Sequence, residues 1–549
     1  MAVKESFATV LETVADVRAD RIAVTQGDRS RTWQELDQRA SRLAAVLAAH
    51  GVGRESRVAI ALYNGIEYLE SVLAVLKLRA TPVNVNYRYQ AQELQYLFGD
   101  ARVEAIIFDS SLAPRVAEAR DSAPGVRALI EVGGGRPAGD HLDYAAAIEA
   151  ASPLPRTARG VDQWLMYTGG TTGQPKGVLV THERLYFIVS GNGFGLLGEP
   201  VPTSLADLRA TTQRLTERGD AIVCLPAPPL MHATGMYTTL GALLASGRVV
   251  FLTGRSYDPH ELARAVAAQQ VDTVSIVGDV FALPLADALE QAAAEGNPYD
   301  LSSLRRMLSV GVMWTAEVKR RLLMHADFVC RDMIAASEGG PFAVSETRRG
   351  DDVVTSRFML LPGARVIDGE GRDVVPGSGQ VGLLAAPADD EIGYLGDAAK
   401  TAQTFRTIGG RRWVVPGDLA SLDADGSVTF RGRDSRVINT GGEKVFAEEV
   451  EQVLLEHPAV RDALVVGLPD QRFGHRVTAV VAPVSARGVT AEELAGYVAT
   501  RLADYKKPRT VVFVDDVRRS PSGKADLRWA AAAAAVQGLP DGPPPDVPS

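Results

Sequence analysis

Apolar positions along the first third of the chain follow two periods, one typical of helices and one of buried strands. Leu36, Leu43 and Leu47 recur at helical spacing, and Thr32 with Glu35 has the spacing of a capping box. Short apolar runs predict strands at 57–62, 82–86 and 104–108, and helical stretches between them predict helices at 66–78 and 91–99. Since strands that alternate with helices form parallel sheets with helices on both faces, we expect an α/β fold with doubly wound sheets.

The same alternation resumes in the middle of the chain and then gives way to two other patterns. Strands are expected at 249–252, 273–277 and 307–310, and helices at 259–269 and 315–324. After about residue 350, short β-like runs broken by Gly, Pro and Asp predict a small β subdomain. From residue 437 the order of a hairpin, a helix at 447–456, strands at 461–467 and 477–483, a helix at 490–503 and a strand at 510–514 predicts a small α+β domain.

These changes predict a large N-terminal domain over 1–432, a hinge at 433–436, a small mobile C-terminal domain over 437–536 and a disordered, proline-rich tail over 537–549. The polar stretch at 433–436 is also typical of an ordinary surface turn.

Composition excludes several classes of protein. The chain of 549 residues has a net charge of −9, which argues against nucleic-acid binding because that task needs a basic face. No apolar run is long enough to span a bilayer, and the first residues lack the apolar core of a signal peptide. The two cysteines, Cys224 and Cys330, lie in apolar contexts and suggest buried thiols, which fits a cytoplasmic protein.

The segment YTGGTTGQPKG, residues 167–177, carries the strongest chemical signal. It holds four glycines, three threonines and Lys176 between two apolar runs, so we expect a strand, a loop and a strand. Glycines bring backbone N–H groups close to a ligand, and hydroxyls and an ammonium group bind phosphate oxygens. The segment is either a polyphosphate cradle or a flexible surface loop. It is not the common P-loop, because Pro175 and Gly177 flank the lysine.

Five further motifs follow in a fixed order. They are PLMHATG (229–235), ASE (336–338), WVVPGD (413–418), GRDSRVINTGGEKVFAEEVE (432–451) and PSGK (521–524). With the loop, they resemble the adenylate-forming (ANL) superfamily of acyl-CoA synthetases, peptide-synthetase adenylation domains and luciferases, from about residue 10 to residue 530. The phrase INTGGEKVFAEEVE is similar to the fatty-acid–CoA ligase branch, and to actinobacterial enzymes for bulky, steroid- or terpenoid-type acids.

The resemblance implies an AMP-forming acyl-CoA ligase that uses ATP, Mg²⁺ and coenzyme A. A carboxylate would attack the α-phosphate of ATP, release pyrophosphate and form an acyl adenylate, which the thiol of CoA then attacks. The substrate implied is a medium- or long-chain acid or a bulky polycyclic one. By resemblance, the catalytic residues are Lys524, Glu338, Lys176 and His232, and the metal ligands are Glu338 and Thr168. The nucleotide would be held by Thr168, Gly169, Gly170, Thr171, Thr172, Gly173, Lys176, Gly311, Ser337, Glu338, Asp418, Arg433 and Lys524.

The resemblance assigns three further sets of residues. The acyl pocket would be formed by His232, Ala233, Thr234, Gly235, Met236, Val277, Gly278 and Ile334, and the pantetheine tunnel by Gly441, Gly442, Glu443 and Lys444. The hinge residue is Ser435. The sequence departs from the family pattern at Gly169, Ile334, Pro416 and Ser435, where Ser, an aromatic residue, Thr and Asp or Lys are common.

Three other functions compete with this one. An acyl-AMP ligase would pass the acyl group to the phosphopantetheine of an acyl carrier protein, and a luciferase-like oxidase would emit light with oxygen. A scaffold that has lost catalysis is the third, because fold alone does not imply function. We expect no nucleic-acid partner and no membrane span, and a homodimer is the commonest default for an oligomer.

Overall fold

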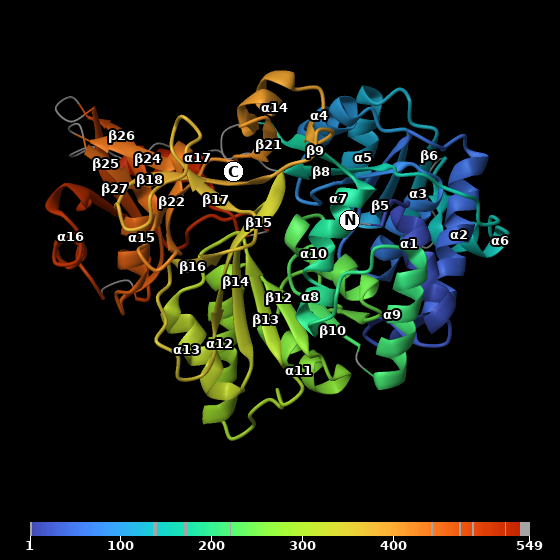
Figure 1. The fold of residues 1–549 in the computed structure, drawn as a ribbon, viewed down its shortest axis with the longest axis horizontal. Coiled ribbons are helices and arrows are strands. Elements are labelled where there is room, and N and C mark those ends of the chain that lie inside the picture. The colour runs from blue at the N-terminus through green and yellow to red at the C-terminus, as the bar shows by residue number, and fades with distance from the viewer. Residues whose placement is uncertain are drawn as a thin grey trace.

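The structure is a computed structural model that describes residues 3–134, 140–168, 174–219, 221–440, 443–470, 474–485, 488–521 and 523–537. Figure 1 shows a large body, built by the N-terminal and middle parts of the chain, beside a smaller body built by the last elements. Within these ranges no helix has the length and apolar character that a bilayer crossing requires.

The first sheet has the order β19-β9-β8-β4-β3-β5-β6-β7. In its centre β3 (Arg57–Ala61) runs parallel to β4 (Thr81–Asn84) and to β5 (Ala105–Asp109), and α3 (Ile66–Lys77) and α4 (Ala91–Ala101) connect them. The predicted alternation is therefore confirmed here. The other strands are β6 (Ala128–Val132), β7 (Leu142–Asp143), β8 (Gln163–Thr168), β9 (Lys176–Thr181) and β19 (Gly393–Tyr394).

The second sheet begins as a parallel sheet and continues into the predicted β subdomain. Its parallel part comprises β1 (Ile22–Gln26), β11 (Arg248–Phe251), β10 (Val223–Pro226), β12 (Thr273–Ile276), β13 (Arg306–Val310) and β14 (Val329–Ala336), with β2 (Arg29–Thr32) antiparallel at the edge. Antiparallel strands follow: β15 (Gly339–Thr347), β16 (Arg357–Leu360), β17 (Arg365–Ile367), β18 (Val381–Pro387), β20 (Phe405–Ile408), β21 (Arg411–Val414), β22 (Asp418–Leu422) and β23 (Ser427–Arg433). The α/β fold class with a β subdomain is confirmed.

Helices cover both sheets, and several of them begin at a side-chain cap. The capping box predicted at Thr32 and Glu35 starts α2 (Trp33–Ala49), and Asp258 caps α11 (Pro259–Gln269). The other helices of the large body are α1 (Phe7–Arg18), α5 (Ala113–Ala119), α6 (Tyr144–Ala150), α7 (His182–Ser190), α8 (Phe194–Leu197), α9 (Leu205–Arg218), α10 (Ala233–Leu244), α12 (Gly278–Ala294), α13 (Ala316–His325) and α14 (Ala398–Thr404).

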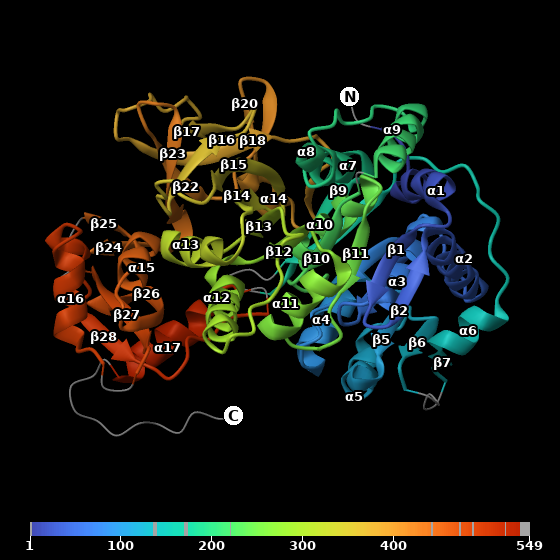
Figure 2. The same ribbon diagram turned by 90° about the horizontal axis from the view of Figure 1, so that it is seen from below.

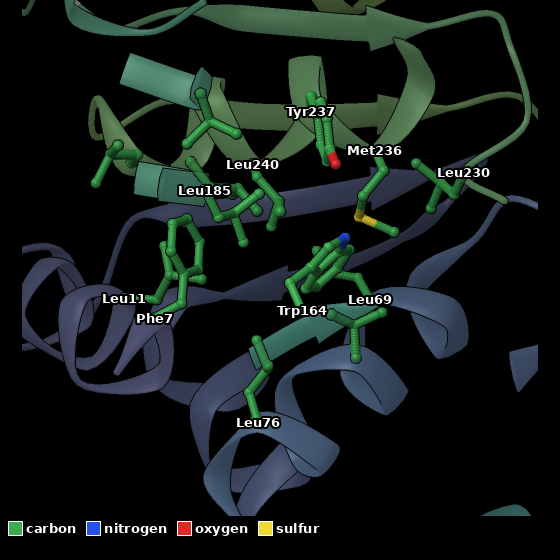
Figure 3. Packing of buried hydrophobic residues seen from close by; sticks show 14 of the residues in the cluster. Phe7, Leu11, Leu69, Leu76, Trp164, Leu185, Leu230, Met236, Tyr237 and Leu240 are labelled. Atoms are coloured by element: carbon green, nitrogen blue, oxygen red, sulfur yellow. The ribbon is translucent and has the colours of Figure 1, made fainter. Parts of the chain in front are cut away.

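The main core lies where α1, α3, α7 and α10 meet β8. Figure 3 shows Phe7 and Leu11 of α1 beside Leu185 of α7, and Trp164 of β8 next to Met236 of α10. All of these side chains are buried. The core therefore joins elements from both sheets, which fixes the two sheets relative to each other.

Charged side chains also tie α1 to its neighbours. Glu12 accepts from Lys77 Nζ at 2.6 Å and from Arg159 Nη1 at 2.7 Å, and all three side chains are at most 7% exposed. Asp16, one turn further along α1, pairs with Arg156 and Arg209, whose side chains are 42% and 47% exposed, and Arg156 also lies 3.9 Å from Glu12. The same helix thus carries one ionic network with a buried part around Glu12 and an exposed part around Asp16.

The last part of the chain forms the small α+β domain predicted from the sequence. Its sheet has the order β25-β24-β27-β26, with β28 parallel to β27. Figure 2 shows it beside α12 and α13 of the large body. The elements are β24 (Val437–Thr440), β25 (Glu443–Phe446), α15 (Ala447–Leu455), β26 (Val460–Asp470), β27 (Gly474–Pro483), α16 (Ala491–Ala499), β28 (Thr510–Phe513) and α17 (Leu527–Gln537). Residues 538–549, nearly all of the predicted tail, lie outside the described residues.

Both cysteines are buried and free, as predicted. Burial raises the pKa of Cys330 to about 12 and that of Cys224 further, so neither thiol is a reactive thiolate at neutral pH.

A buried histidine predicts how the fold responds to acid. His182 begins α7, its Nδ1 accepts from the Phe7 N–H at 3.1 Å, and burial lowers its pKa from 6.5 to about 4. The unfolded chain binds a proton below about pH 6.5, whereas the native ring binds it only near pH 4, so this part of the stability is present above pH 6.5 and lost on acidification. His182→Asn, whose amide oxygen can accept the same bond, should lose about 2 kcal/mol less than the parent between about pH 7.5 and about pH 5. Urea unfolding of both proteins at about pH 7.5 and about pH 5 tests this, and equal losses would contradict it.

Candidate active site

A single cleft of about 3150 Å³ lies between the large body and the small domain. It is lined by the ends of strands from the first sheet, the parallel sheet and the β subdomain, and by residues of the small domain that include Glu448, Gln452, Arg519 and Lys524. Most of the predicted site residues that the structure describes line this one cleft. They are Thr168, Lys176, His232, Ala233, Thr234, Val277, Gly311, Ile334, Ser337, Glu338, Asp418, Arg433, Ser435 and Lys524.

The two strands that flank the predicted polyphosphate cradle at 167–177, named here the phosphate-loop motif, form an antiparallel pair. Thr168 at the end of β8 lies opposite Lys176 at the start of β9. Asn84 holds β8 in place, since its side chain accepts from Tyr167 N–H at 2.7 Å and donates to Tyr167 O at 2.9 Å and to Met231 O at 2.6 Å. The two strands of the predicted strand–loop–strand unit are confirmed. The loop residues between them, Gly169, Gly170, Thr171, Thr172 and Gly173, lie outside the described residues.

Glu338 lies in the turn between β14 and β15 and is half-buried at the cleft wall. Its carboxylate accepts a hydrogen bond from the Tyr394 hydroxyl at 2.5 Å. Thr168 lines the same cleft and offers a hydroxyl oxygen. Within the described ranges no group of three or more His, Cys, Asp or Glu could hold a metal by itself. One carboxylate and one hydroxyl fit Mg²⁺, which keeps several waters and binds substrate phosphates as its other ligands.

Asp418 begins β22 and is buried with one acceptor unused. Its Oδ1 accepts from Arg433 Nε at 3.0 Å, whereas its Oδ2 is buried without a hydrogen bond. Burial raises the pKa of Asp418, and the Arg433 guanidinium opposes this rise. A buried oxygen without a donor is costly, so Oδ2 is suited to accept from a ligand hydroxyl.

Lys524 enters the cleft from the small domain on a tight turn. The turn is closed by bonds from Ser520 N to Lys524 O at 2.8 Å and from Lys524 N to Ser520 Oγ at 3.1 Å. Gly523 has a φ of +74° and lies against Val277 and Val280, where a Cβ would come within 3.3 Å of both. A side chain at Gly523 would therefore push the turn away from the large body.

The Lys524 ammonium faces groups from three separate elements. The Lys524 side chain is exposed to solvent within the cleft. The protein around the ammonium group still removes part of its hydration, and this desolvation lowers its pKa. The positive charge of Arg433 lowers the pKa further, whereas Glu338 and Asp418 raise it. The structure thus brings together Lys524, Glu338, Asp418 and Arg433, which lie up to 186 positions apart in the sequence (524 − 338).

His232 stands at the start of α10 beside the same charges. Burial, with Lys524 and Arg88 nearby, lowers its pKa to about 3, so the ring is neutral at neutral pH. Its Nε2 is buried without a hydrogen bond. The ring can therefore contact an uncharged or anionic substrate group but brings no charge of its own.

The wall beyond His232 is mostly apolar. Ile334, where the family pattern has an aromatic residue, is buried and supplies an apolar surface. Three predicted pocket residues lie behind this wall instead of lining it. Met236 packs in the main core (Figure 3), Gly235 lies against the carbonyls of Pro228 and Pro229, and Gly278 against those of Val312 and Met313.

The junction between the bodies has two differently anchored ends. Arg433 is paired to β22 of the large body, whereas Arg436 forms ion pairs with Glu448 at 2.9 Å and with Glu451, both in α15 of the small domain. Between them Asp434 and Ser435 are exposed.

The predicted pantetheine residues lie on the hairpin β24–β25. Glu443 and Lys444 are exposed there and do not line the cleft, and Gly441 and Gly442 lie outside the described residues. In Figure 2 this hairpin stands at the side of the small domain away from the large body.

Sequence reasoning missed three residues of the site. Asn84 holds the phosphate-loop strand, Tyr394 holds Glu338, and Asp397 forms an ion pair with Lys176. The segment that carries Tyr394 and Asp397 has no motif of its own, and these contacts join residues 56 and 221 positions apart.

Known proteins are similar to this chain in sequence and in architecture. A family profile described as AMP-binding enzyme matches residues 11–386, and one described as AMP-binding enzyme C-terminal domain matches residues 449–524. A 3-oxocholest-4-en-26-oate–CoA ligase of Rhodococcus rhodochrous is 37% identical over 536 residues, 96% of this chain and 95% of that protein. A medium/long-chain-fatty-acid–CoA/3-oxocholest-4-en-26-oate–CoA ligase of Mycobacterium tuberculosis is 38% identical over 541 residues, 96% of each.

Solved structures agree with the fold. The crystal structure of the anthranilate CoA ligase AuaEII in complex with anthranoyl-AMP has a TM-score of 0.83 and 22% identity, and the match covers 97% of this chain and 99% of that one.

Proposed function

The chain belongs to the family of AMP-binding enzymes, and from this premise we propose that it activates a carboxylic acid with ATP and transfers the acyl group to coenzyme A. The superfamily predicted from the sequence is confirmed, and the predicted enzyme class agrees with the CoA ligase activity of both relatives named above. ATP and CoA are its substrates, and Mg²⁺ is the metal we propose at Glu338 and Thr168.

One observation carries the proposal: a lysine from the small domain meets two carboxylates and an arginine of the large body in one cleft. Attack on the α-phosphate needs positioning and neutralisation of negative charge more than covalent help. Lys524 would neutralise the charge that develops between the carboxylate and the α-phosphate. Asp418 Oδ2 would accept from a ribose hydroxyl, and Lys176 and Thr168 would face the β- and γ-phosphates. Bound Mg²⁺ would further neutralise the phosphate charge.

The proposed acid is a medium- or long-chain fatty acid or a bulky polycyclic acid. Both relatives are named for 3-oxocholest-4-en-26-oate, and one of them also for medium- and long-chain fatty acids. The cleft supports this choice, because it continues past His232 along an apolar wall that includes Val277 and Ile334. Because His232 is neutral, it adds no second positive charge beside the substrate carboxylate that Lys524 would contact.

A panel of acids tests the activity. Purified protein is assayed for acid-dependent exchange of pyrophosphate into ATP, with short, long, aromatic and polycyclic acids, and products with CoA are identified by mass spectrometry. We expect exchange and acyl-CoA with apolar acids, most strongly with long or polycyclic ones. Absence of exchange with every acid would overturn the proposal and would favour a scaffold that has lost catalysis.

Further assays test the acyl acceptor, the luciferase-like alternative and the oligomeric state. A parallel reaction with an acyl carrier protein in place of CoA distinguishes the acyl-AMP ligase, and light emission with oxygen tests the luciferase-like oxidase. We propose CoA as the acceptor, a cytoplasmic location where ATP and CoA are supplied, and a homodimer, which sedimentation measures directly.

A further inference from the structure

The segment that follows β18 joins two parts of the site. Its first element, β19, pairs antiparallel with β9, and Tyr394 lies opposite Val178 in this register. The next residue, Leu395, donates its N–H to Gly177 O at 2.8 Å. The backbone of Tyr394 is therefore fixed to the strand that leaves the phosphate-loop motif.

The side chain of Tyr394 is held as firmly as its backbone. Its ring lies against Phe405 with centroids 6.3 Å apart, and its N–H donates to Thr401 Oγ1 at 2.9 Å. Its hydroxyl donates to Glu338 Oε1 at 2.5 Å, and no other hydrogen bond to this carboxylate exists among the described residues.

We propose that Tyr394 is the positioning residue of the metal-binding carboxylate: its phenol fixes one oxygen of Glu338 so that the other remains for the metal. The inference rests on the proposed function of Glu338. A glutamate at a cleft wall has several rotamers, and a metal ligand held by an outer hydrogen bond needs no ordering when the metal arrives.

A second contact of the same segment supports this role. Asp397, three residues after Tyr394, forms an ion pair with Lys176 and caps α14 through Lys400 N at 2.8 Å. One short segment thus contacts both the proposed metal ligand and the proposed phosphate lysine. It links the two groups that would face the triphosphate.

The test measures metal binding rather than turnover. Mn²⁺ replaces Mg²⁺, a non-hydrolysable ATP analogue occupies the site, and free Mn²⁺ is measured by electron paramagnetic resonance. Tyr394→Phe should weaken Mn²⁺ binding to the enzyme–nucleotide complex about 10-fold, the lower range for loss of an outer-shell partner. In a Glu338→Gln background the same change should add almost nothing, because the interaction that it removes is already lost.

Tyr144→Phe is the matched control. Tyr144 also donates to a glutamate, Glu70, at 2.7 Å, but this pair is buried between α6 and α3, far from the cleft. Its loss should lower the unfolding temperature and leave Mn²⁺ affinity unchanged. Unaltered affinity in Tyr394→Phe, or an equal loss in the Glu338→Gln background, would overturn the inference.

The two proposals fail separately. A protein that exchanges pyrophosphate but whose Tyr394→Phe variant binds Mn²⁺ normally keeps its function and loses this role of Tyr394. A protein that exchanges with no acid but loses Mn²⁺ affinity in the variant keeps the role of Tyr394 and loses the proposed reaction.

Discussion

Replacing Lys524 by alanine is expected to slow adenylate formation about 10²–10³-fold, the usual loss for one group that stabilises transition-state charge. The lysine is the cationic group that the small domain brings to Glu338 and Asp418, and its turn docks on α12 through Gly523. In the second step the thiol attacks the acyl carbonyl and expels AMP, which is a good leaving group, so this step depends less on a cation beside the α-phosphate. Transfer from a chemically prepared acyl adenylate to CoA should therefore stay close to the parent rate.

Two assays on one protein check this difference. Pyrophosphate exchange reports the first step, and CoA thioester formation from added acyl adenylate reports the second. Lys507→Ala is the matched control, since Lys507 lies in the same domain but pairs with Asp504 on the surface. Equal loss of both steps in Lys524→Ala would contradict a role confined to adenylation.

Glu12→Ala should lower the free energy of unfolding by about 3–5 kcal/mol, the usual cost of leaving a buried cation unpaired. Lys77 would keep Asp37 as a partner at 2.5 Å, but Arg159, with a side chain only 3% exposed, would lose its only carboxylate among the described residues. The loss should appear as a lower urea midpoint for the transition of the large body.

The matched control lies on the same helix. Asp16→Ala removes ion pairs to Arg156 and Arg209, whose exposed guanidinium groups remain hydrated, so its cost should be under about 1 kcal/mol. Similar losses for the two variants would show that burial does not set the cost here.

The elements predicted best are those whose ends carry local signals. The helix expected at 259–269 is α11 itself, because Asp258 caps it and Pro259 suits its first turn. By contrast α1 was not predicted, since most of its length is buried and no polar stripe marks its period. The helix expected over 490–503 ends at Ala499, after which the chain bends so that Leu502 packs on the small core and Lys506 reaches Glu449.

Within the site, sequence motifs located the groups that would contact the substrates but not those that hold them. Lys524, Asp418 and Glu338 belong to motifs, and the structure places all three at one cleft. The contacts of Tyr394 and Asp397 depend on how β19 joins the first sheet after more than two hundred intervening residues. No local pattern encodes such a pairing, because it arises from packing of the whole body.

The anchoring of the two arginines at the junction determines where the chain can turn. Arg433 binds Asp418 of the large body at 3.0 Å and donates its N–H to Glu448 at 3.4 Å, whereas Arg436 pairs with Glu448 and Glu451, both of α15. Since the Asp434 N–H also donates to Gly417 O of the large body at 2.8 Å, a swing at the predicted hinge would turn the backbone torsions between Asp434 and Arg436. Such a swing would withdraw the ammonium group of Lys524 from the cleft, and adenylate formation would then require the small domain to return.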